Sequence, residues 1–357
     1  MRIEVFNDLP PQDVWEAFQR APCSADYFAS RAWYEVFTRS VLAGGDRAQF
    51  VLARDTDDAP SAMLPLWRHP AAGGRLGAQR LTSLANYYTC LYQPLISADM
   101  AAAERGIDAL AQHLIDKRRQ WSVLDLRPLP TDLPLLTRFA QAFVKRGFAV
   151  NQDIAFGNWY YPCAGVSFET YFATRRKKTR STVRSKTTQL SKEFKFEISI
   201  TTGVDGLEAA LAAYNAVYGL SWKHAEPYPN FIPYFAHALA SAQQLRLGVL
   251  RLDDEPAAAQ LWFVAHGVAH IFKLAYDERF AQHSVGTLLT MKLFEHCLDI
   301  DKVNCIDFLS GDDEYKKHWM TDHRQRIGME IINTRSPHGC LLTARRALGR
   351  LKRRQQS

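Results

Sequence analysis

The sequence lacks the cysteine pairs that bind zinc and the dense cysteine pattern of a disulfide framework. Its six cysteines stand far apart, and none forms a C-x-x-C pair. They are Cys23, Cys90, Cys163, Cys297, Cys305 and Cys340. We therefore expect reduced thiols in the core, no disulfide and no metal site.

Long hydrophobic runs are missing as well. No stretch approaches the ~18 uninterrupted apolar residues of a membrane span, and the polar start MRIEVFNDLPPQD is not a signal peptide. We therefore expect a cytoplasmic protein. With 357 residues, 47% of them hydrophobic and 23% charged, the chain is long enough for two domains with separate cores.

Acidic residues are nearly absent from two segments. Residues 175–195 carry nine Lys and Arg against one Glu, or +8, and residues 341–357 carry six against none, or +6. The whole chain has a net charge of +7, so the remainder has 7 − 14 = −7. This distribution favours two local contacts with anions over a general affinity for polyanions.

Residues 257–317 are the most informative part of the chain. AAAQLWFVA and VAHIFKLAY predict two strands around a turn at His266 and Gly267, and LLTMKLFEHCL predicts a helix. Because His270 lies on a strand, it does not form a metal pair with His266. At the helix start, a Ser284 cap and the small Gly286 would leave backbone N–H groups open to a phosphate. A short buried strand, 303–309, and a polar loop follow.

These segments resemble the GNAT acyltransferase superfamily, in particular the acetyltransferase-like domain of proteins associated with cellulose and exopolysaccharide biosynthesis, a branch related to the Fem peptidyltransferases. The resemblance rests on Tyr276-Asp277, 284–289, 307–311 and Tyr315-Lys316. It implies that the helix start binds the pyrophosphate of acyl-coenzyme A (acyl-CoA). The residues that would hold this donor are Leu274, Tyr276, Gln282, Ser284, Val285, Gly286, Thr287 and Leu288. Only Gly286 remains of the glycines common in that loop.

The order of predicted elements is the same in both halves of the chain: a strand, two helices, three strands, a helix, a strand, a helix or loop, and a final strand. In the first half, 81–96 is read as one of these strands. We therefore expect an α/β (α+β) fold of two tandem GNAT-like domains, each a mixed, mostly antiparallel sheet flanked by helices. The expected limits are 1–165 for a degenerate first domain, 166–340 for the acyltransferase domain, and 341–357 for a basic tail. In the first copy, Asp99 stands where a phosphate would bind, which suits an acceptor-binding or structural domain.

Residues 168–195 predict one long basic helix between the halves. Two interpretations stay open. The helix is a solvated linker whose cationic side chains cover apolar surface, or Arg176, Lys177 and Arg180, with Arg184, clamp an anionic acceptor or nucleotide. No aromatic residue is interleaved with its arginines to stack on bases, so nucleic acid is not an expected partner.

Acyl transfer from a thioester to an amine needs a deprotonated nucleophile, a donor to the carbonyl oxygen and a proton for the thiolate. The resemblance implies that the strands 272–276 and 306–309 splay apart around the thioester. Tyr315 follows the second strand and is the candidate acid, and Lys316 is a candidate for neutralising phosphate or acceptor charge. The general base stays open among Asp277, Asp307, His224 and Glu226, and each aspartate is equally suited to a structural role.

Clusters of aromatic and polar residues suggest the acceptor site. They include Tyr87, Trp159, Trp222 and Lys223, a mixture that suits a sugar or a peptide. The expected activity is N-acylation of such an acceptor in cell-envelope or exopolysaccharide biosynthesis, with acetyl-CoA or another acyl-CoA as co-substrate. The alternatives are an aminoacyl-tRNA-dependent transferase of the Fem kind and a non-catalytic binding module. The basic tail either contacts anionic membrane lipid or forms a disordered end.

Overall fold

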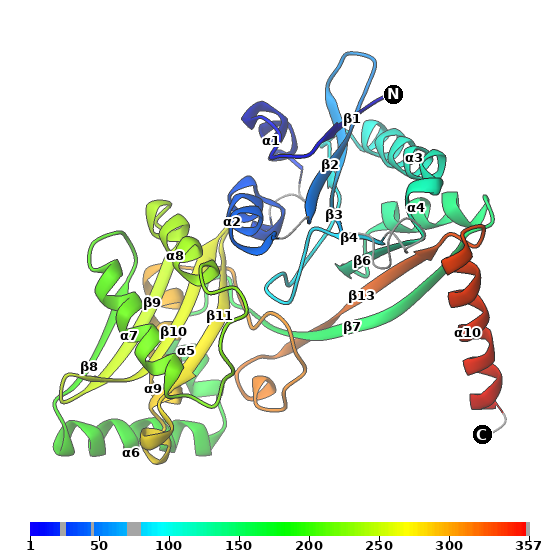
Figure 1. Ribbon diagram of the computed structural model, residues 1–357. Coiled ribbons are helices and arrows are strands. Elements are labelled where there is room, and N and C mark those ends of the chain that lie inside the picture. Colours follow the sequence, from blue (N-terminus) through cyan, green and yellow to red (C-terminus); the bar gives the residue numbers. More distant parts are fainter. Residues whose placement is uncertain (22–25, 44–45, 70–79, 355–357) are drawn as a thin grey trace. The chain divides into compact units, whose positions relative to one another are not determined.

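The computed structural model describes residues 1–21, 26–43, 46–69 and 80–354, and in the last helix it describes side chains only up to residue 346. The chain divides into two units (Figure 1). Unit 1 comprises Met1–Phe156 and Gln325–Ser357, and unit 2 comprises Gly157–Arg324. The limits expected from the sequence were 165/166 and 340/341, so the two divisions differ chiefly in where the last strand is placed.

Unit 1 is a mixed sheet with helices on both faces. Its strands follow the order β1-β2-β3-β4-β6-β13, and the β4–β6 pair is parallel while β1–β2, β2–β3, β3–β4 and β6–β13 are antiparallel. The strands are β1 (Arg2–Phe6), β2 (Arg47–Arg54), β3 (Pro60–Arg68), β4 (Arg80–Ser83), β6 (Val123–Leu129), β7 (Ala149–Pro162) and β13 (Asp322–Ile332), and β5 (Leu95–Ile96) pairs with β3. The stretch 81–96 is therefore two short strands with irregular chain between them, because Asn86, Tyr88 and Thr89 hydrogen-bond among themselves in a turn.

Alternation along the strands of unit 1 separates two apolar faces. Val51 and Leu66 belong to the core cluster that also contains Leu110 and Phe139 of the helices α3 (Met100–Asp116) and α4 (Pro134–Val144). Phe50 faces the other way and contacts aromatic rings of α1 (Gln12–Phe18) and α2 (Arg31–Val41). The short helices η2 (Tyr27–Ala29) and η4 (Arg118–Gln120) complete the unit, together with the basic helix α10 (Pro337–Arg354). Asp99 caps α3: its carboxylate accepts from the N–H of Ala101 at 2.9 Å.

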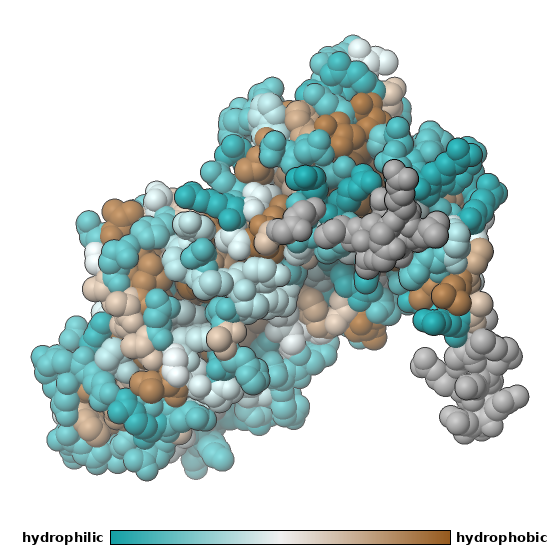
Figure 2. Space-filling model, in the orientation of Figure 1, coloured by the Kyte–Doolittle hydropathy of each residue, from teal (hydrophilic) through white to brown (hydrophobic). Residues whose placement is uncertain are grey.

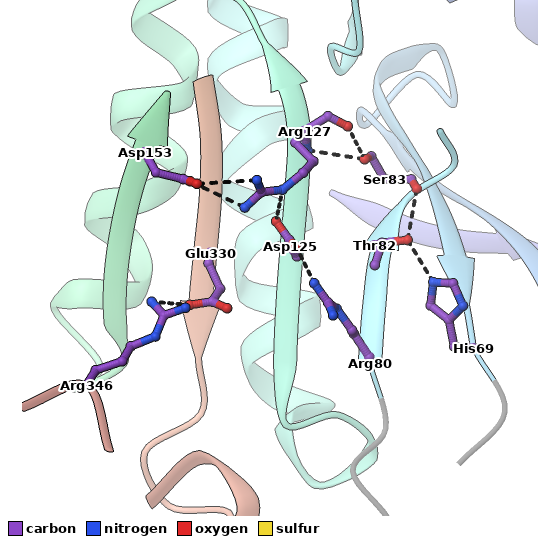
Figure 3. A network of polar contacts seen from close by, with 9 residues as sticks. All are labelled: His69, Arg80, Thr82, Ser83, Asp125, Arg127, Asp153, Glu330 and Arg346. Atoms are coloured by element: carbon purple, nitrogen blue, oxygen red, sulfur yellow. Dashed lines mark hydrogen bonds and ion pairs between the residues drawn. The ribbon is translucent and has the colours of Figure 1, made fainter. Parts of the chain in front are cut away.

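A ladder of charged side chains crosses the strands β4, β6, β13 and β7 (Figure 3). Asp125 accepts from Arg80 at 2.5 Å and from Arg127 at 2.7 Å, and Arg127 continues to Asp153 at 3.3 Å. A Cβ at Gly328 on β13 would lie 2.7 Å from Cζ of Arg127, so this position has to be glycine for the guanidinium to pass over the strand. This face of the sheet is therefore polar.

Unit 2 has the same arrangement of strands and helices. Its strands run in the order β7-β12-β11-β10-β9-β8, and only the β11–β12 pair is parallel among those described. They are β8 (Phe196–Thr201), β9 (Leu245–Leu252), β10 (Glu255–Ala265), β11 (Val268–Tyr276) and β12 (Cys305–Asp307). The hairpin of β10 and β11 is confirmed, with His266 and Gly267 both at positive φ in its turn. The predicted mixed, mostly antiparallel sheet flanked by helices is therefore present in each unit.

Helices cover both faces of the unit 2 sheet. Trp262 of β10 packs on Phe294 of α9 (Val285–Glu295), whereas the neighbouring Phe263 packs on Phe235 of α8 (Phe231–Ser241). Helix α7 (Leu207–Gly219) lies on the α8 side, since it contacts α8 as well as β10. The remaining helices are α5 (Phe168–Thr174), α6 (Lys177–Glu193), η5 (Glu278–His283), η6 (His296–Ile300) and η7 (Lys316–His318).

The two halves of the chain exchange their last strands. In unit 1, β13 pairs with β6, with Ile331 opposite Leu124, although β13 follows the second half in sequence. In unit 2, β7 pairs with β12, with Tyr161 opposite Ile306, although β7 ends the first half. Each sheet is thus completed by a strand from the other half of the chain.

The basic segment is not one helix, as the sequence predicted, but two. Arg175 and Arg176 are extended, with ψ of 156° and 141°. The break allows Arg175 to be buried: its guanidinium donates to the carbonyl of Trp319 at 2.7 Å and stacks 4.5 Å from the ring of Tyr171. The helix is therefore interrupted at the point where Arg175 makes its buried contacts.

Cys90, Cys163 and Cys297 are buried and Cys305 is half-buried, but Cys340 is exposed, so the expectation of core thiols is wrong for Cys340; Cys23 lies outside the described residues. None of these five described thiols is in a disulfide. No described helix combines the length and apolar composition that a membrane span requires. In the same residues, no cluster of three or more His, Cys, Asp and Glu side chains could hold a metal ion.

Candidate active site

The strands β11 and β12 separate as predicted. Their parallel pairing runs from Val268 opposite Cys305 to His270 opposite Asp307, and within the described chain β12 ends there. Strand β11 continues for six more residues to Tyr276. The edge of β11 that faces β12 is therefore open at its C-terminal end, where its backbone groups are available to a ligand.

A cavity of about 510 Å³ lies at this opening. One wall is the end of β11, Leu274 to Tyr276, and another is the first turn of α9 with Gly286 and Thr287. The loop after β12 contributes Phe308, Asp313, Tyr315 and Trp319, and the loop after α7 contributes Trp222 and Lys223. Seven of the residues predicted for the site line it: Leu274, Tyr276, Gly286, Thr287, Trp222, Lys223 and Tyr315.

The predicted serine cap of α9 is wrong. Ser284 adopts the left-handed conformation, with φ of 57°, and its side chain makes no capping hydrogen bond. The reason lies in the preceding short helix η5, whose last turn is closed by the N–H of Ser284 on the carbonyl of Ala281 at 3.1 Å. The N–H of Leu288 donates to the Ser284 carbonyl at 3.1 Å, and the N–H groups of Val285, Gly286 and Thr287 precede this bond in the first turn of α9.

Gly286 allows the start of α9 to lie close to the ring of Tyr276. An ideal Cβ at this position would stand 3.2 Å from Cδ1 of Tyr276, which is tighter than ordinary van der Waals contact. Gln260 of β10 holds the start of α9 against the sheet. Its buried amide donates to the Gly286 carbonyl at 3.0 Å and to Thr290 at 2.8 Å. Sequence reasoning missed Gln260, although a single polar residue within AAAQLWFVA was the available signal.

The other predicted donor residues lie outside the cavity lining. Val285 and Leu288 are 1% and 3% exposed and belong to the hydrophobic core of unit 2. Gln282 is exposed and hydrogen-bonds to His283 at 3.3 Å. Their side chains therefore support the helix start rather than face the ligand, although the backbone N–H of Val285 belongs to the first turn.

Asp277 is tied to the start of η5. Its carboxylate accepts from the N–H of Arg279 at 2.9 Å and from the guanidinium of the same residue at 2.5 Å. Hydrogen bonds from Arg279 hold the pKa of Asp277 below its usual range, against the effect of burial. A buried carboxylate so engaged is a cap and an ion-pair partner, not an available base.

Asp307 anchors the loop after β12. One of its oxygens accepts from Asn158 Nδ2 at 2.6 Å and from the N–H of Leu309 at 2.7 Å, and the other accepts from Arg324. Arg324 in turn donates to Asn158 Oδ1 at 2.6 Å, which closes the ring of contacts. The residue is 3% exposed, and both of its carboxylate oxygens accept from protein donors.

Replacing Asp307 with Ala should lower the free energy of unfolding by about 2–4 kcal/mol, because Asn158 loses its buried acceptor while the half-exposed Arg324 regains water. Chemical denaturation measures this loss. Asp307→Asn keeps the shape and one acceptor and should cost less. A catalytic base would behave differently: both variants would keep the parent's stability and lose turnover.

Lys316 has an internal role in the same loop. Its ammonium group donates to the carbonyls of Ser310 and Gly311 and pairs with Asp313 at 3.2 Å. The side chain is 5% exposed, and Gly311 has a φ of 106°, a conformation that favours glycine. Lys316 therefore fixes the turn that presents Tyr315 to the cavity.

Tyr315 is the group in the cavity best suited to donate a proton. Its ring meets Phe308 edge-on at 5.6 Å between centroids, and 45% of the residue is exposed. Burial of the hydroxyl raises the pKa of Tyr315 to about 12, with a smaller contribution from Asp313. The phenol therefore stays protonated at neutral pH.

The remaining predicted acceptor residues occupy different places. Trp159 lies in β7 with its ring 4.7 Å from that of His323, and Tyr87 is an exposed residue of unit 1 whose ring contacts Tyr88. Arg176, Lys177 and Arg180 lie at the start of α6, over which the surface is mostly hydrophilic (Figure 2). Arg176 approaches His318 at 3.3 Å, so this end of α6 adjoins the loop that carries Tyr315.

The opposite end of α6 adjoins the start of α9, where the ring of Phe194 lies 5.5 Å from that of His283. A helix from Lys177 to Glu193 is about 24 Å long at 1.5 Å per residue. The three predicted cations are therefore at the far end of α6 from the turn that would bind a pyrophosphate. This separation favours contact with an acceptor over contact with the donor's pyrophosphate.

Replacing Arg176, Lys177 and Arg180 together with Gln should raise the KM for an anionic acceptor by about 5- to 30-fold at low salt, and added salt should have the same effect on the parent. Separate titrations of acetyl-CoA and of the acceptor measure this. Acetyl-CoA affinity should scarcely change. A solvated linker would leave both ligands unaffected, and a clamp for the donor would weaken acetyl-CoA alone.

Unit 1 contains a larger hollow of about 990 Å³. Charged side chains of both signs line it, among them Glu35, Arg39, Asp46, Arg47 and His69. Its described lining includes neither a helix start nor a splayed strand pair. The cavity in unit 2 is thus the better candidate for acyl transfer.

Residues 177–317 match the family model of an acetyltransferase (GNAT) domain. No curated protein matches the sequence. Among solved structures, FemX has a TM-score of 0.61 at 12% identity, covering 92% of this chain and 97% of its own. A conserved protein of unknown function from Bacteroides thetaiotaomicron has a TM-score of 0.57 at 12% identity, covering 93% and 100%. L-PGS from Bacillus licheniformis has 0.52 at 12%, covering 97% and 98%. The chain therefore has a GNAT-superfamily fold of the FemX-related kind.

Proposed function

We propose that this protein is a GNAT-type N-acyltransferase that transfers an acyl group from acyl-CoA to an amino group of a sugar or peptide acceptor. The observation that carries the proposal is one cavity that combines a helix start, an open strand edge and the Tyr315 hydroxyl. Each supplies one requirement of the reaction: a site for the donor's phosphates, donors for the carbonyl oxygen, and a proton.

The residues of the cavity divide the work as follows. The N–H groups of Val285 to Thr287 bind the pyrophosphate at the positive end of the α9 dipole. Backbone N–H groups at the end of β11 polarise the thioester carbonyl, so the acceptor amine attacks its carbon. Tyr315 then donates its proton to the sulfur as the carbon–sulfur bond breaks, and it recovers a proton from the new amide nitrogen.

Two aromatic rings at the cavity indicate the acceptor class. Trp222 and Tyr276 lie 4.6 Å apart at the cavity, and Trp222 is 52% exposed. Ring faces beside polar tips suit a sugar or a peptide. The resemblance to the exopolysaccharide-associated branch points in the same direction, toward an acceptor of the cell envelope. A cytoplasmic location remains part of this proposal.

A second candidate follows from the structural likeness to FemX over 92% of the chain: the donor is an aminoacyl-tRNA instead of acyl-CoA. Isothermal titration of the purified protein with acetyl-CoA, and with charged tRNA in parallel, distinguishes the candidates. Saturable binding of acetyl-CoA, followed by acetylation of an amine, supports the proposal. Binding of charged tRNA alone supports the second candidate, and binding of neither supports a non-catalytic module.

We also propose that α10 contacts anionic membrane lipid. The segment is a helix over Pro337–Arg354 rather than a disordered end, and Arg346 pairs with Glu330 of β13 at 2.5 Å, which fixes its first half to unit 1. The six cations of residues 341–357 would attract an anionic surface. Co-sedimentation with phosphatidylglycerol vesicles tests this contact, and equal binding after removal of residues 341–357 would contradict it.

A further inference from the structure

Lys223 is placed at the cavity by the loop after α7. Its side chain lines the same cavity as Tyr315 and the first turn of α9. The loop is held in place by the neighbouring Trp222, whose ring lies 4.6 Å from Tyr276, and by Ser221, whose hydroxyl bonds the Tyr218 carbonyl at 2.8 Å. The amine is therefore carried on an anchored segment, close to the open end of β11.

The charged residues near Lys223 form ion pairs that do not include it. Lys273 of β11 pairs with Glu226 at 2.5 Å, and Lys316 pairs with Asp313 at 3.2 Å. In the described chain, no carboxylate forms an ion pair with Lys223 itself; its recorded side-chain contacts are the rings of Tyr218 and Trp222, each 5.8 Å from the nitrogen. The charged groups around Lys223 are therefore paired with one another, and the amine of Lys223 has no ion-pair partner among the described residues.

Burial and like charge both favour the neutral amine. Burial is the main cause that lowers the pKa of Lys223, to about 8, and the cations Lys273 and Lys316 lower it further against the opposing effect of Glu226. A substantial fraction is then neutral near pH 8, where an ordinary lysine is almost fully charged.

The carboxylates considered from the sequence are poorly suited to accept a proton. Asp277 is engaged by Arg279, Asp307 by Asn158 and Arg324, and Glu226 by Lys273. His224 is not among the residues that line the cavity. None of these four groups is therefore suited to act as the general base at the cavity, whereas Lys223 is.

On the basis of the proposed function, we infer that Lys223 is the general base of the acyl transfer. Its neutral amine takes a proton from the acceptor's ammonium group and becomes an ammonium group itself, which leaves the acceptor amine free to attack the thioester carbon. The carbon–sulfur bond breaks and the sulfur leaves with the Tyr315 proton. Tyr315 regains a proton from the nitrogen of the new amide, and Lys223 releases its proton to water. In the net reaction, one thioester and one ammonium ion give one amide, one thiol and one proton.

Competitive labelling of the intact protein with acetic anhydride, followed by mass spectrometry, tests the state of the amine without an acceptor. Reactivity of Lys223 should rise with pH with a midpoint near 8, below the value of about 10.4 for lysine in a model peptide. Saturating acetyl-CoA should slow its labelling and leave Lys302 unaffected. A midpoint for Lys223 equal to that of a model lysine peptide labelled alongside would overturn the inference.

Turnover with two small amines tests the role. Lys223→Met should lose about 10²-fold in acetyl transfer to propylamine, which is protonated at pH 7, but little with hydroxylamine, which is already neutral. Affinity for acetyl-CoA should be unchanged, and Lys302→Met is the matched control for a lost lysine. Equal losses with both amines would show a binding role for Lys223 and overturn the inference, as would no loss with either. Failure of the parent to bind acetyl-CoA would instead overturn the proposed function, and the labelling midpoint would still decide the state of Lys223.

Discussion

Tyr315→Phe should lower turnover by about 10²- to 10⁴-fold while acetyl-CoA binds as tightly as to the parent. Phenylalanine keeps the ring that meets Phe308 edge-on, so the cavity wall is preserved. What is lost is the Tyr315 hydroxyl proton that is proposed to go to the departing sulfur. Steady-state kinetics together with a titration of acetyl-CoA separate the two effects.

The pH dependence provides a further test of Tyr315. Because its pKa is raised to about 12, the phenol keeps its proton throughout the range of an ordinary assay. It is a weaker acid than a thiol, whose pKa is about 8.5, so it acts in concert with bond cleavage rather than by complete transfer beforehand. The parent's pH profile should therefore show no ionisation of Tyr315 below about pH 11. Unchanged turnover in Tyr315→Phe would assign this residue to packing.

The parts of the fold that the sequence predicted correctly depend on local patterns. Two apolar, strand-like runs around a short turn identified β10 and β11, and the residues at the turn, His266 and Gly267, adopt the positive φ that such a turn needs. The splay of β11 from β12 was expected from the superfamily resemblance, and the pairing ends at Asp307. Periodicity and turn chemistry act over a few residues, so one sequence reveals them.

The exchange of β7 and β13 could not be predicted in this way. Pairing partners are set by contacts between residues far apart in the chain, such as Ile331 with Leu124. The order of elements is the same whether or not the last strands are exchanged. Domain limits drawn from element order alone therefore differ from the units of the structure.

The misassigned details of the site have a similar cause. A serine before a helix predicts a cap only if its backbone is extended, and the preceding η5 forces Ser284 into the left-handed region. Asp277 and Asp307 were considered as bases because they end strands, but Arg279 and Arg324 neutralise them. Lys223 was expected only to bind the acceptor, since the ion pairs that isolate its charge come from β11 and from the loop after β12.

Gly286→Val should weaken acetyl-CoA binding by about 100-fold or more, which is close to 2.7 kcal/mol. A Cβ at this position already lies 3.2 Å from the ring of Tyr276, and the two further methyl groups of valine have to displace that ring or enter the cavity beside Thr287. Either outcome blocks the backbone N–H groups that a phosphate would reach. Isothermal titration measures the loss.

Two related variants identify the cause of that loss. Gly286→Ala adds only the Cβ, which a shift of Tyr276 by a few tenths of an ångström accommodates, so its effect should be intermediate. Gly219→Ala changes a helical glycine whose Cβ would meet nothing within 4 Å, and it should leave binding unchanged. If Gly286→Val has the parent's unfolding curve and binds acetyl-CoA with undiminished affinity, the donor's phosphates do not lie at the start of α9. No loss for Gly219→Ala, an intermediate loss for Gly286→Ala and a large loss for Gly286→Val would tie binding to the space in front of this one helix turn. Helix propensity alone would not produce such losses, because alanine and valine both favour a helix more than glycine does.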